Sequence, residues 1–415
     1  MNRRGFVHSL AAGAAGLAAG SRGVRAQAPG DAQDQPLSVI LEGAVRPEQY
    51  VGQRRIPEDM PLPSVMRALM DFLGEDYGAE TIDAHGTQWH RDVALIHYMG
   101  VSGDAFRFFW IGKLPPGGIK PEQFDEDPLE PSRRCFEASG FDHEIILQRE
   151  FAARAANTHG TAEDEAALRA RMIESLRDRR RPVVATGVTA PLDTCLVAGY
   201  DQGGDVLIGW RTEPGGPGIL FERDKQFHQG GWYAGLMWAV FLGDQHERPP
   251  VADTQRKALE WGLELMDAKS SRPWKTGFDA YTAWAEALLV DEDFPADDPD
   301  ALRERVAYID PWIWDLAERR AYGGTFLGQV AAQQPAAAEA LLAAGECFQA
   351  EHDMMWQING LLRPDDREET LLRTLADPEV RRRIAGIVLA AQQQDLEAAG
   401  HIEWALAQWN GQEGA

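Results

Sequence analysis

The segment Pro182–Trp210, PVVATGVTAPLDTCLVAGYDQGGDVLIGW, decides the fold class. It contains three short runs rich in Val, Leu and Ile, at residues 182–188, 195–200 and 205–210, and residues that favour turns separate them. β-Branched runs of this length between Pro, Asp and Gly clusters are typical of strands, and the second and third runs predict a hairpin. Because nearly all their residues are apolar, we expect these strands in the middle of a sheet.

Helical and extended patterns alternate on both sides of this segment. Apolar residues at helical spacing predict helices from Pro61 to Gly74 and from Trp89 to Met99. Further short elements are predicted as helices at 131–139 and from Thr161, and as strands at 105–111, 144–147, 218–221 and 236–242. We therefore expect residues 38–243 to form an α+β domain around an antiparallel sheet of roughly five to seven strands.

A second region begins after a linker. Pro249 and Pro250 lie between charged residues in the segment 244–253, a composition typical of linkers. Beyond it the 3.6-residue periodicity of helices recurs without any strand pattern, at 258–266, 281–289, 312–321, 337–361, 367–375 and 378–409. Six such helices predict an all-α helical bundle over residues 254–410.

The first 26 residues have the composition of a secretory signal. Arg3 and Arg4 precede an Ala- and Gly-rich apolar run, and Val24-Arg25-Ala26 supplies small residues for cleavage. Paired arginines before such a run indicate the twin-arginine type of signal peptide. The sequence thus predicts a signal peptide at 1–26, a flexible tether at 27–37, export by the twin-arginine (Tat) machinery and a periplasmic location.

Charge and cysteine usage narrow the function classes. The chain has 65 Asp and Glu against 41 Lys and Arg, a net charge of −24, and four of the arginines lie in the signal segment. A chain this acidic repels nucleic acid and anionic membrane surfaces, so neither is an expected partner after signal cleavage. The three cysteines, Cys135, Cys195 and Cys347, are too few and too scattered for a disulfide framework.

Two readings apply to Cys195. It lies on a predicted central strand directly after Asp193 and Thr194. In an apolar run a buried cysteine behaves as a small, inert hydrophobic residue. At a strand entrance, by contrast, a thiol can be exposed and activated by a nearby histidine. The packing reading is favoured.

A polar cluster precedes the second predicted helix. The segment 83–92 contains His85, Trp89, His90, Arg91 and Asp92. Such density of imidazole and carboxylate groups suggests a metal site or a general base. On one helix, however, His90 and the later histidine at position 97 would lie roughly 10 Å apart along the axis, too far to share one ion. A polar helix start with paired charges is the favoured reading, and no metal is expected.

Other polar and aromatic residues are candidates for binding. Arg107 follows a Ser-Gly-Asp turn and would hold either a ligand carboxylate or a structural Asp such as Asp92. Together with Trp89, Arg91 and Trp210 it forms the set of candidate ligand-binding residues. Several tryptophans could line a cleft between sheet and bundle, although core filling explains most of them more simply: Trp210, Trp232, Trp238, Trp284, Trp312 and Trp314.

The order of these elements resembles a known family. The motifs are Arg181-Pro182-Val183-Val184, the strand end Ala198-Gly199-Tyr200-Asp201 and the hairpin strand at 204–210. They are similar to papain-like (C39-type) domains, and more closely to the N-terminal domain of butirosin biosynthesis protein H and its relatives, where a helical domain also follows. The resemblance covers most of residues 60–410. It implies a papain-like fold and, in active members, acyl transfer or amide cleavage by a Cys–His pair without a cofactor.

The sequence departs from that family at the catalytic positions. The family's nucleophilic cysteine lies at the start of the central helix, where this chain reads Gly86-Thr87-Gln88-Trp89-His90. The family's strand histidine falls at Asp193 or Thr194, and the group expected beside Gly204 and Asp205 has no clear match. The resemblance therefore implies the fold more firmly than the catalytic pair.

Three functions follow as alternatives. In the first, a thiol-dependent acyl transferase or amide hydrolase, Cys195 attacks an acyl carbon, His90 is the general base, and Asp92 or Asp193 orients it. In the second, the protein is a non-catalytic periplasmic binding or accessory protein, a pseudoenzyme on the same fold, with a small-molecule or peptide-like ligand. The weakest alternative is a metal-assisted hydrolase that uses His85 and His90.

Overall fold

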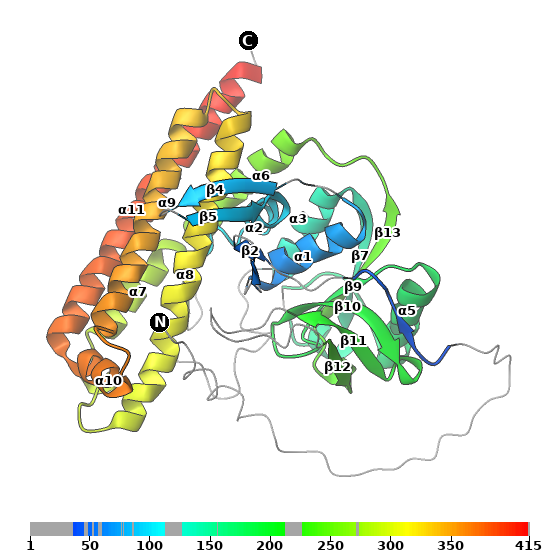
Figure 1. Ribbon diagram of the computed structural model, residues 1–415, viewed down its shortest axis with the longest axis horizontal. Coiled ribbons are helices and arrows are strands. Elements are labelled where there is room, and N and C mark those ends of the chain that lie inside the picture. Colours follow the sequence, from blue (N-terminus) through cyan, green and yellow to red (C-terminus); the bar gives the residue numbers. More distant parts are fainter. Residues whose placement is uncertain are drawn as a thin grey trace.

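The protein is an α+β structure in which a mixed eight-stranded sheet is followed by a helical region (Figure 1). The computed structural model describes residues 36–44, 49–51, 54–56, 60–75, 77, 79–84, 87–112, 127–155, 157–211, 226–270 and 274–413. For residues 49–51, 54–56, 79–84, 87–92 and 410–413 it describes the backbone alone. The predicted fold class, α+β with a helical bundle behind it, is confirmed.

The central sheet is built around the segment Pro182–Trp210. Its strands are β1 (Val39–Ile40), β7 (Phe141–Gln148), β8 (Thr161–Glu163), β9 (Val183–Thr186), β10 (Thr194–Asp201), β11 (Val206–Arg211), β12 (Phe227–Gly230) and β13 (Trp238–Gln245). They lie in the order β12-β11-β10-β9-β13-β7-β8, with β1 beside β10. All pairs are antiparallel except β7 with β8. The predicted hairpin is thus confirmed as β10–β11, and β9 lies next to it.

Both faces of this sheet are buried, as the apolar runs predict. Along β10, Leu196 packs in one hydrophobic core, while Cys195 and Val197 pack in another on the opposite face. Alternate residues of a strand point to opposite faces, and β9, β13 and β7 divide their side chains between the two cores in the same way. Helices α1, α2 and α3 cover the Leu196 face, and α5 covers the Cys195 face.

The helices of the α+β part differ in places from the sequence predictions. They are α1 (Pro61–Phe72), α2 (Val93–Val101), α3 (Glu130–Ser139), α4 (Arg149–Ala152) and α5 (Glu165–Ile173), which continues into a π-helical turn at Glu174–Asp178. The helix predicted from Trp89 begins only at Val93. The helix predicted from Thr161 begins at Glu165, because the Asp164 side chain caps it by accepting a hydrogen bond from the Ala167 amide at 3.0 Å.

Short two-stranded pieces accompany the main sheet. They are β2 (Gln49–Val51) with β3 (Arg54–Ile56), β4 (Ala79–Ala84) with β5 (Thr87–Asp92), and β6 (Phe109–Trp110) with β14 (Lys275–Thr276). The strand predicted over 105–111 is therefore reduced to β6, since a series of turns occupies 102–106. The strand predicted at 218–221 lies outside the described residues.

Six long helices follow, as the periodicity predicts. They are α6 (Val251–Met266), α7 (Gly277–Leu288), α8 (Pro299–Gln333), α9 (Ala338–Leu362), α10 (Glu368–Ala376) and α11 (Pro378–Glu413). Figure 1 shows α8, α9 and α11 side by side along one edge of the molecule, away from the main sheet. None of the helices within the described ranges is both long and apolar enough to cross a bilayer.

The two regions share one hydrophobic core. The largest core cluster joins Met66 of α1 and Met99 of α2 to Phe326 of α8, Phe348 of α9 and Ile402 of α11. Helix α2 is the centre of this cluster, since every residue from 94 to 101 is buried. The linker predicted at 244–253 is a real extended segment up to Pro250, but apolar packing continues across it.

Candidate functional site

Cys195 is placed as a core residue. It lies on β10 between Ala185 of β9 and Arg211 of β11, and its side chain is 0 % exposed. Burial raises the pKa of the Cys195 thiol well above its usual range, the charge of Asp193 adds to this, and Arg211 opposes it. Because the thiolate is the nucleophile, a fully buried thiol with a raised pKa is a poor nucleophile at neutral pH.

Asp193 and Thr194 complete a turn between β9 and β10. The Asp193 carboxylate accepts a hydrogen bond from the Thr189 hydroxyl at 2.5 Å, and the Asp193 carbonyl accepts one from the Gly187 amide at 2.9 Å. The Thr194 and Thr186 hydroxyls are 2.9 Å apart and hydrogen-bonded across the two strands. These contacts explain Asp-Thr before the cysteine as turn and strand-entry chemistry.

The polar segment before α2 lies on the other side of the sheet from Cys195. Trp89, His90, Arg91 and Asp92 belong to strand β5, which pairs with β4 and runs directly into α2. Figure 1 shows the β4–β5 hairpin beside the long helices, with α1 between it and β9–β10. The side chains of this strand, and all of His85, lie outside the described residues.

The predicted Cys195–His90 pair stays a prediction, because the structure describes the backbone of His90 in β5 but not its side chain. Helix α2 packs in the core that Leu196 enters, whereas Cys195 packs against Leu168 and Met172 of α5. Adjacent residues of a strand point to opposite faces of the sheet. The sequence patterns did not indicate which face of the sheet lies toward β5. The role predicted for Asp92 likewise stays a prediction, and the Asp193 carboxylate is engaged by the Thr189 hydroxyl at 2.5 Å.

The other predicted binding residues are also dispersed. The Arg107 guanidinium lies over the Trp261 ring of α6 at 5.9 Å from its centroid, and Arg134 of α3 lies over the same ring at 4.3 Å. Trp210 lies on β11 opposite Leu196. These are packing positions in two different parts of the molecule.

Of the six tryptophans named as possible cleft residues, Trp232, Trp238 and Trp284 are buried in cores, and Trp210, Trp312 and Trp314 are partly buried. Trp232, Trp238 and Trp284 are 1 %, 6 % and 0 % exposed. Trp284 stacks on Trp110 with ring centroids 5.4 Å apart, and Trp314 meets Trp356 edge to face at 4.3 Å. For the buried tryptophans, this packing supports a role in filling the core and not in lining a cleft.

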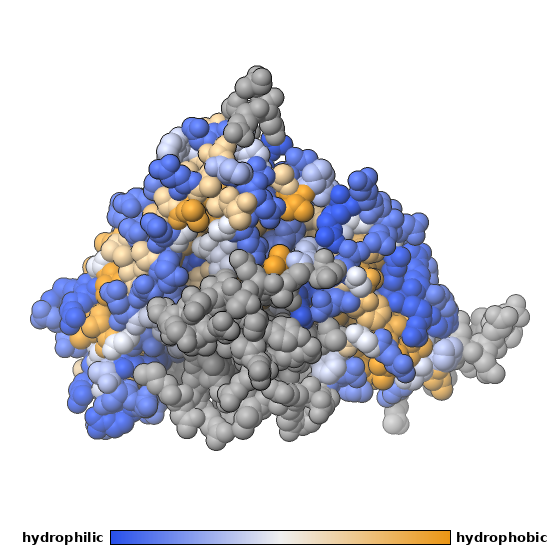
Figure 2. Space-filling view, turned by 45° about the horizontal axis from the view of Figure 1, so that its top comes forward, coloured by the Kyte–Doolittle hydropathy of each residue, from blue (hydrophilic) through white to orange (hydrophobic). Residues whose placement is uncertain are grey.

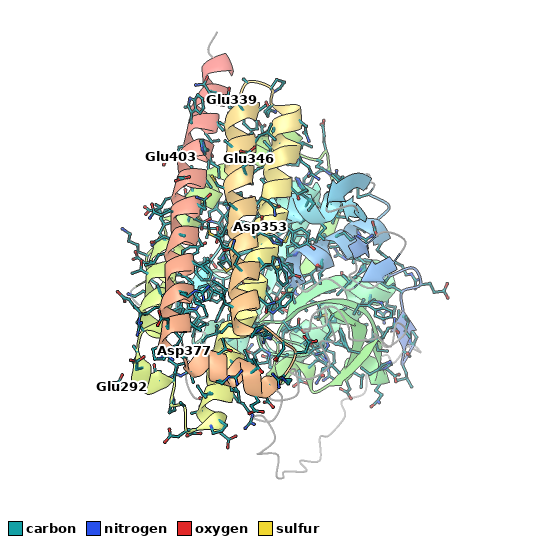
Figure 3. All side chains as sticks on the ribbon, turned by 60° about the vertical axis from the view of Figure 1, so that its left-hand side comes forward. Glu292, Glu339, Glu346, Asp353, Asp377 and Glu403 are labelled. Carbon is teal, nitrogen blue, oxygen red and sulfur yellow. The ribbon has the colours of Figure 1, made fainter. Side chains whose placement is uncertain are left out.

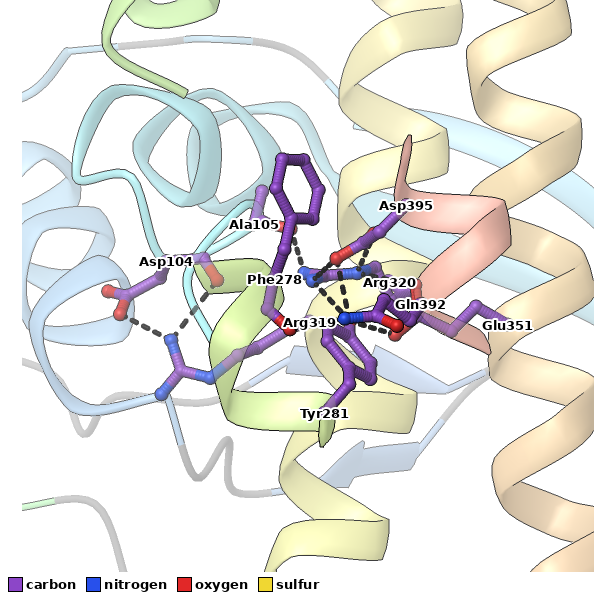
Figure 4. Close-up of polar contacts among 9 residues, drawn as sticks. All are labelled: Asp104, Ala105, Phe278, Tyr281, Arg319, Arg320, Glu351, Gln392 and Asp395. Atoms are coloured by element: carbon purple, nitrogen blue, oxygen red, sulfur yellow. Dashed lines mark hydrogen bonds and ion pairs between the residues drawn. The ribbon is translucent and has the colours of Figure 1, made fainter. Parts of the chain in front are cut away.

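The structure assembles a different group of ionisable side chains, deep in the helical region. We call Tyr281 of α7, Arg320 of α8, Glu351 of α9 and Asp395 of α11 the buried charge cluster (Figure 4). None of the four residues is more than 2 % exposed. Arg320 binds the Glu351 carboxyl through Nε at 2.9 Å and the Asp395 carboxylate through Nε and Nη2 at 2.9 and 2.6 Å.

Arg320 makes two further hydrogen bonds, to Tyr281 and to the backbone at Ala105. Nη2 donates to the Tyr281 hydroxyl at 3.0 Å, and Nη1 donates to the Ala105 carbonyl oxygen at 2.9 Å. That carbonyl belongs to the turns after α2, so the cluster ties the helical region to the α+β part. Each of the three guanidinium nitrogens thus makes at least one hydrogen bond, and this makes the burial of the charge tolerable.

The charge states within the cluster differ. Burial raises the pKa of Glu351 well above its usual range, and the charge of Asp395 raises it further against the opposing effect of Arg320. Burial alone would lower the pKa of Arg320, but Asp395 and Glu351 together raise it well above the ordinary value. The raised pKa of Glu351 means that it keeps its proton to a higher pH than an exposed glutamate does.

A second arginine reinforces the same junction. Arg319 binds Asp315 on its own helix at 2.7 Å and reaches the Asp104 carboxylate at 2.6 Å (Figure 4). It also donates to the Asp104 carbonyl oxygen at 3.1 Å. Consecutive arginines thus hold consecutive residues of the turns after α2, Asp104 and Ala105.

Sequence reasoning missed this cluster, although a signal was present. Arg320, Glu351 and Asp395 each occupy a core position of a long helix, in step with Ile313 and Leu316, with Phe348 and Met355, and with Ala391 and Ala398 respectively. A charged residue at a core position on three separate helices indicates a buried ion pair. The cluster has no access to solvent, so it is a positioning element rather than a reaction centre.

One hollow at the surface is lined by charged residues. It has a volume of about 210 Å³ and lies between β7 and the end of α5, but its arginines are already paired, Arg171 with Glu144 at 2.7 Å and Arg179 with Glu174 at 2.8 Å. Within the part of the chain that the structure describes, no three His, Cys, Asp or Glu side chains are grouped so that they could hold a metal ion.

Comparison with known proteins adds no assignment. No family model matches the sequence, and no curated protein matches it.

Proposed function

We propose that the protein is a non-catalytic, exported binding or accessory protein on a papain-like fold. The observation that carries the proposal is the position of Cys195, fully buried on the sheet face turned away from α2. In the active members of the family that the sequence resembles, a Cys–His pair does the chemistry, and in this chain the position of the family's cysteine is occupied by the segment 86–90.

The other two thiols support the same conclusion. Cys135 is 0 % exposed in α3, where burial raises the pKa of its thiol well above the usual range. Cys347 is 8 % exposed in α9, and burial followed by the charge of Glu397 raises the pKa of its thiol to about 11. All three cysteines are therefore protonated at neutral pH and shielded from substrate, which disfavours nucleophilic catalysis by any of them.

The surface and the junction fit a binding role. On the face seen in Figure 2, hydrophilic residues cover most of the described surface and apolar residues form small groups. The buried charge cluster and Arg319 hold the helices against the α+β part. Because these contacts hold the two parts in one arrangement, the protein presents surfaces of fixed shape to a small-molecule or peptide-like ligand. Binding at such a surface does not require a cleft to open.

Export rests on the twin-arginine pattern at 1–26. Replacing Arg3 and Arg4 by lysine is expected to leave the precursor in the cytoplasm, as measured by fractionation and immunoblotting against a cytoplasmic and a periplasmic marker. Unchanged periplasmic recovery of the lysine variant would remove this part of the proposal.

Thiol labelling tests the central claim. The purified protein is treated with a maleimide at neutral pH, in parallel with a sample unfolded in guanidinium chloride, and the labelled cysteines are mapped by mass spectrometry. We expect labelling of all three cysteines only after unfolding. Fast, stoichiometric labelling of Cys195 in the native sample would instead support the thiol enzyme. A Cys135→Ala/Cys347→Ala variant leaves Cys195 as the single thiol and removes ambiguity in the readout.

A further inference from the structure

The outer side of helix α11 carries a regular row of exposed residues. We call this row the outer seam; its members are Arg382, Gly386, Leu389, Gln393, Leu396, Gly400 and Glu403. They are spaced alternately by four and three residues, which is the heptad spacing of helices that pair along a seam. Every member is exposed. Figure 1 shows α11 at the edge of the molecule, where a partner can reach it.

The composition of the outer seam is unusual for a solvent face. Leu389 and Leu396 are 42 % and 41 % exposed, and Trp404 beside the seam is 50 % exposed. The neighbouring helix α9 provides a contrast, because its outward row includes Glu339, Glu346 and Asp353 (Figure 3). The outward row of α9 thus carries three acidic residues beside one exposed leucine, Leu342, whereas the α11 seam carries two leucines, one on either side of Gln393, and a single acidic residue.

The seam reads the same in both directions if Arg and Glu are counted as complementary. From the central Gln393, both directions give Leu, then Gly, then a charged residue, and the charges are Arg382 at one end and Glu403 at the other. A two-fold symmetric interface requires such self-complementarity, because residue i of one copy contacts residue j of the other and the reverse. We propose that a second copy of this chain covers the outer seam, with its own α11 antiparallel.

The register of this pairing follows from the seam itself. Arg382 lies opposite Glu403 of the second copy, Leu389 lies opposite Leu396, and Gln393 lies next to its own counterpart. Gly386 and Gly400 lie opposite each other, and a Cβ placed at either meets nothing within 4 Å, so both leave room for a close helix approach. Each end of the interface then carries one ion pair.

Charge favours a second copy over an unrelated basic partner. Two copies of a chain with a net charge of −24 repel each other over most of their surface. The outer seam is an exception, because its one Arg and one Glu balance, and neither forms an ion pair with any other residue in the described ranges. A basic partner would be attracted to the acidic row of α9, whereas the balanced seam is complementary in charge to a second copy of itself in the antiparallel orientation.

Sedimentation velocity of the purified protein over a concentration series tests the proposal. We expect a concentration-dependent dimer. Arg382→Glu and Glu403→Arg each place like charges opposite one another at both ends, and each is expected to raise the dimer dissociation constant about tenfold or more. The double variant Arg382→Glu/Glu403→Arg restores opposite charges and is expected to return the dissociation constant to near the wild-type value.

Two further variants complete the experiment. Leu389→Glu/Leu396→Glu is expected to give a monomer, whereas Leu342→Glu, at a leucine of α9 that is 53 % exposed and outside the seam, is expected to leave the dimer intact. Thermal melts by circular dichroism check that each variant stays folded, as substitutions at exposed positions should. A wild-type protein that stays monomeric throughout the series, or a dimer that the double charge exchange does not restore, overturns the proposal.

Discussion

Glu351 and Asp395 bind the same guanidinium, yet they do different things in the folded state. Asp395 neutralises Arg320 through two hydrogen bonds, at 2.9 and 2.6 Å, and accepts a third from Tyr281 at 2.6 Å. Glu351, with its raised pKa, is expected to contribute a neutral carboxyl group. A buried guanidinium that loses its one charged partner is costly, whereas the loss of a neutral hydrogen-bonding partner of similar shape is not.

This difference predicts unequal effects of two conservative substitutions. Asp395→Asn is expected to lower the free energy of unfolding by about 3–5 kcal/mol, because it leaves Arg320 charged and unbalanced in the core. Glu351→Gln is expected to leave it unchanged or to raise it, because the amide is neutral in both states, whereas the raised pKa of Glu351 costs the folded wild type stability at neutral pH. Urea denaturation of the two variants at neutral pH measures both values. Equal losses would show that Glu351 is ionised.

The raised pKa of Glu351 also sets the sign of a pH effect. The unfolded chain releases this proton above about pH 4.5, while the folded protein keeps it to a higher pH. The contribution of Glu351 to stability is therefore present in full below pH 4.5 and is lost as the pH rises toward the folded-state pKa. Glu351→Gln lacks this loss, so its stability relative to wild type should improve between acidic and neutral pH. A relative stability that worsens over that range would contradict the assignment.

For single residues, the sequence shows which side chains are polar, but it does not show on which face of the sheet or next to which helix they lie. The favoured reading of Cys195 as a packing residue followed from its apolar neighbours alone, and burial supports it. The side of the sheet that Cys195 faces depends on strand register and on which helix crosses which face, and no local pattern encodes these. Arg320 lies in an apolar stripe that was interpreted simply as helix, because its partners are on helices far away in the chain.

The packing of α2 against α8 rests on the absence of a side chain. A Cβ placed on Gly100 of α2 would lie 2.3 Å from a ring carbon of Phe326. Gly328, two residues further along α8, has open space around its own missing Cβ, with nothing within 4 Å. The two glycines lie in helices and differ mainly in this crowding.

The same substitution should therefore have opposite effects at these two positions. Gly100→Ala is expected to lower the free energy of unfolding by about 1–3 kcal/mol through overpacking against Phe326. Gly328→Ala is expected to raise it by about 0.5–1 kcal/mol, because alanine loses less backbone entropy on folding into a helix. Chemical denaturation monitored by circular dichroism gives both values, and a stabilising Gly100→Ala would show that α2 and α8 can move apart at no cost.

Among the elements, the sequence predicted the long and strongly periodic ones. The six helices of the second region and the strands β9–β11 have signals that repeat over several turns or lie between clear turn residues. The error at residues 89–92 has a local cause: Trp89 and Val93 are four residues apart, a helical spacing, but the residues from 87 pair with β4 as a strand. Tertiary pairing overrode a helical pattern that had only one repeat to support it.

On the scale of the whole molecule, the chain changes character at the linker but its core does not divide there. Sequence composition separates an α+β region from a helical one, and that distinction is confirmed. Yet Met99 of α2 shares a hydrophobic cluster with Phe326 and Phe348, and the Ala105 carbonyl is bound by Arg320. Composition reports the secondary structure of each region and says nothing of the surface that the regions bury against each other.

A shared core predicts that neither region folds alone. Without the helices after residue 250, α2 would expose an apolar surface on the side that α6 and α8 cover, and Asp104 would lose its partner Arg319. The intact protein is expected to unfold in one transition, with coincident curves from tryptophan fluorescence and circular dichroism. The fragment 27–250 is expected to show no cooperative transition. Two separate transitions in the intact protein, or a fragment that melts cooperatively, would mean that the linker divides two domains and that the arginine junction only joins them.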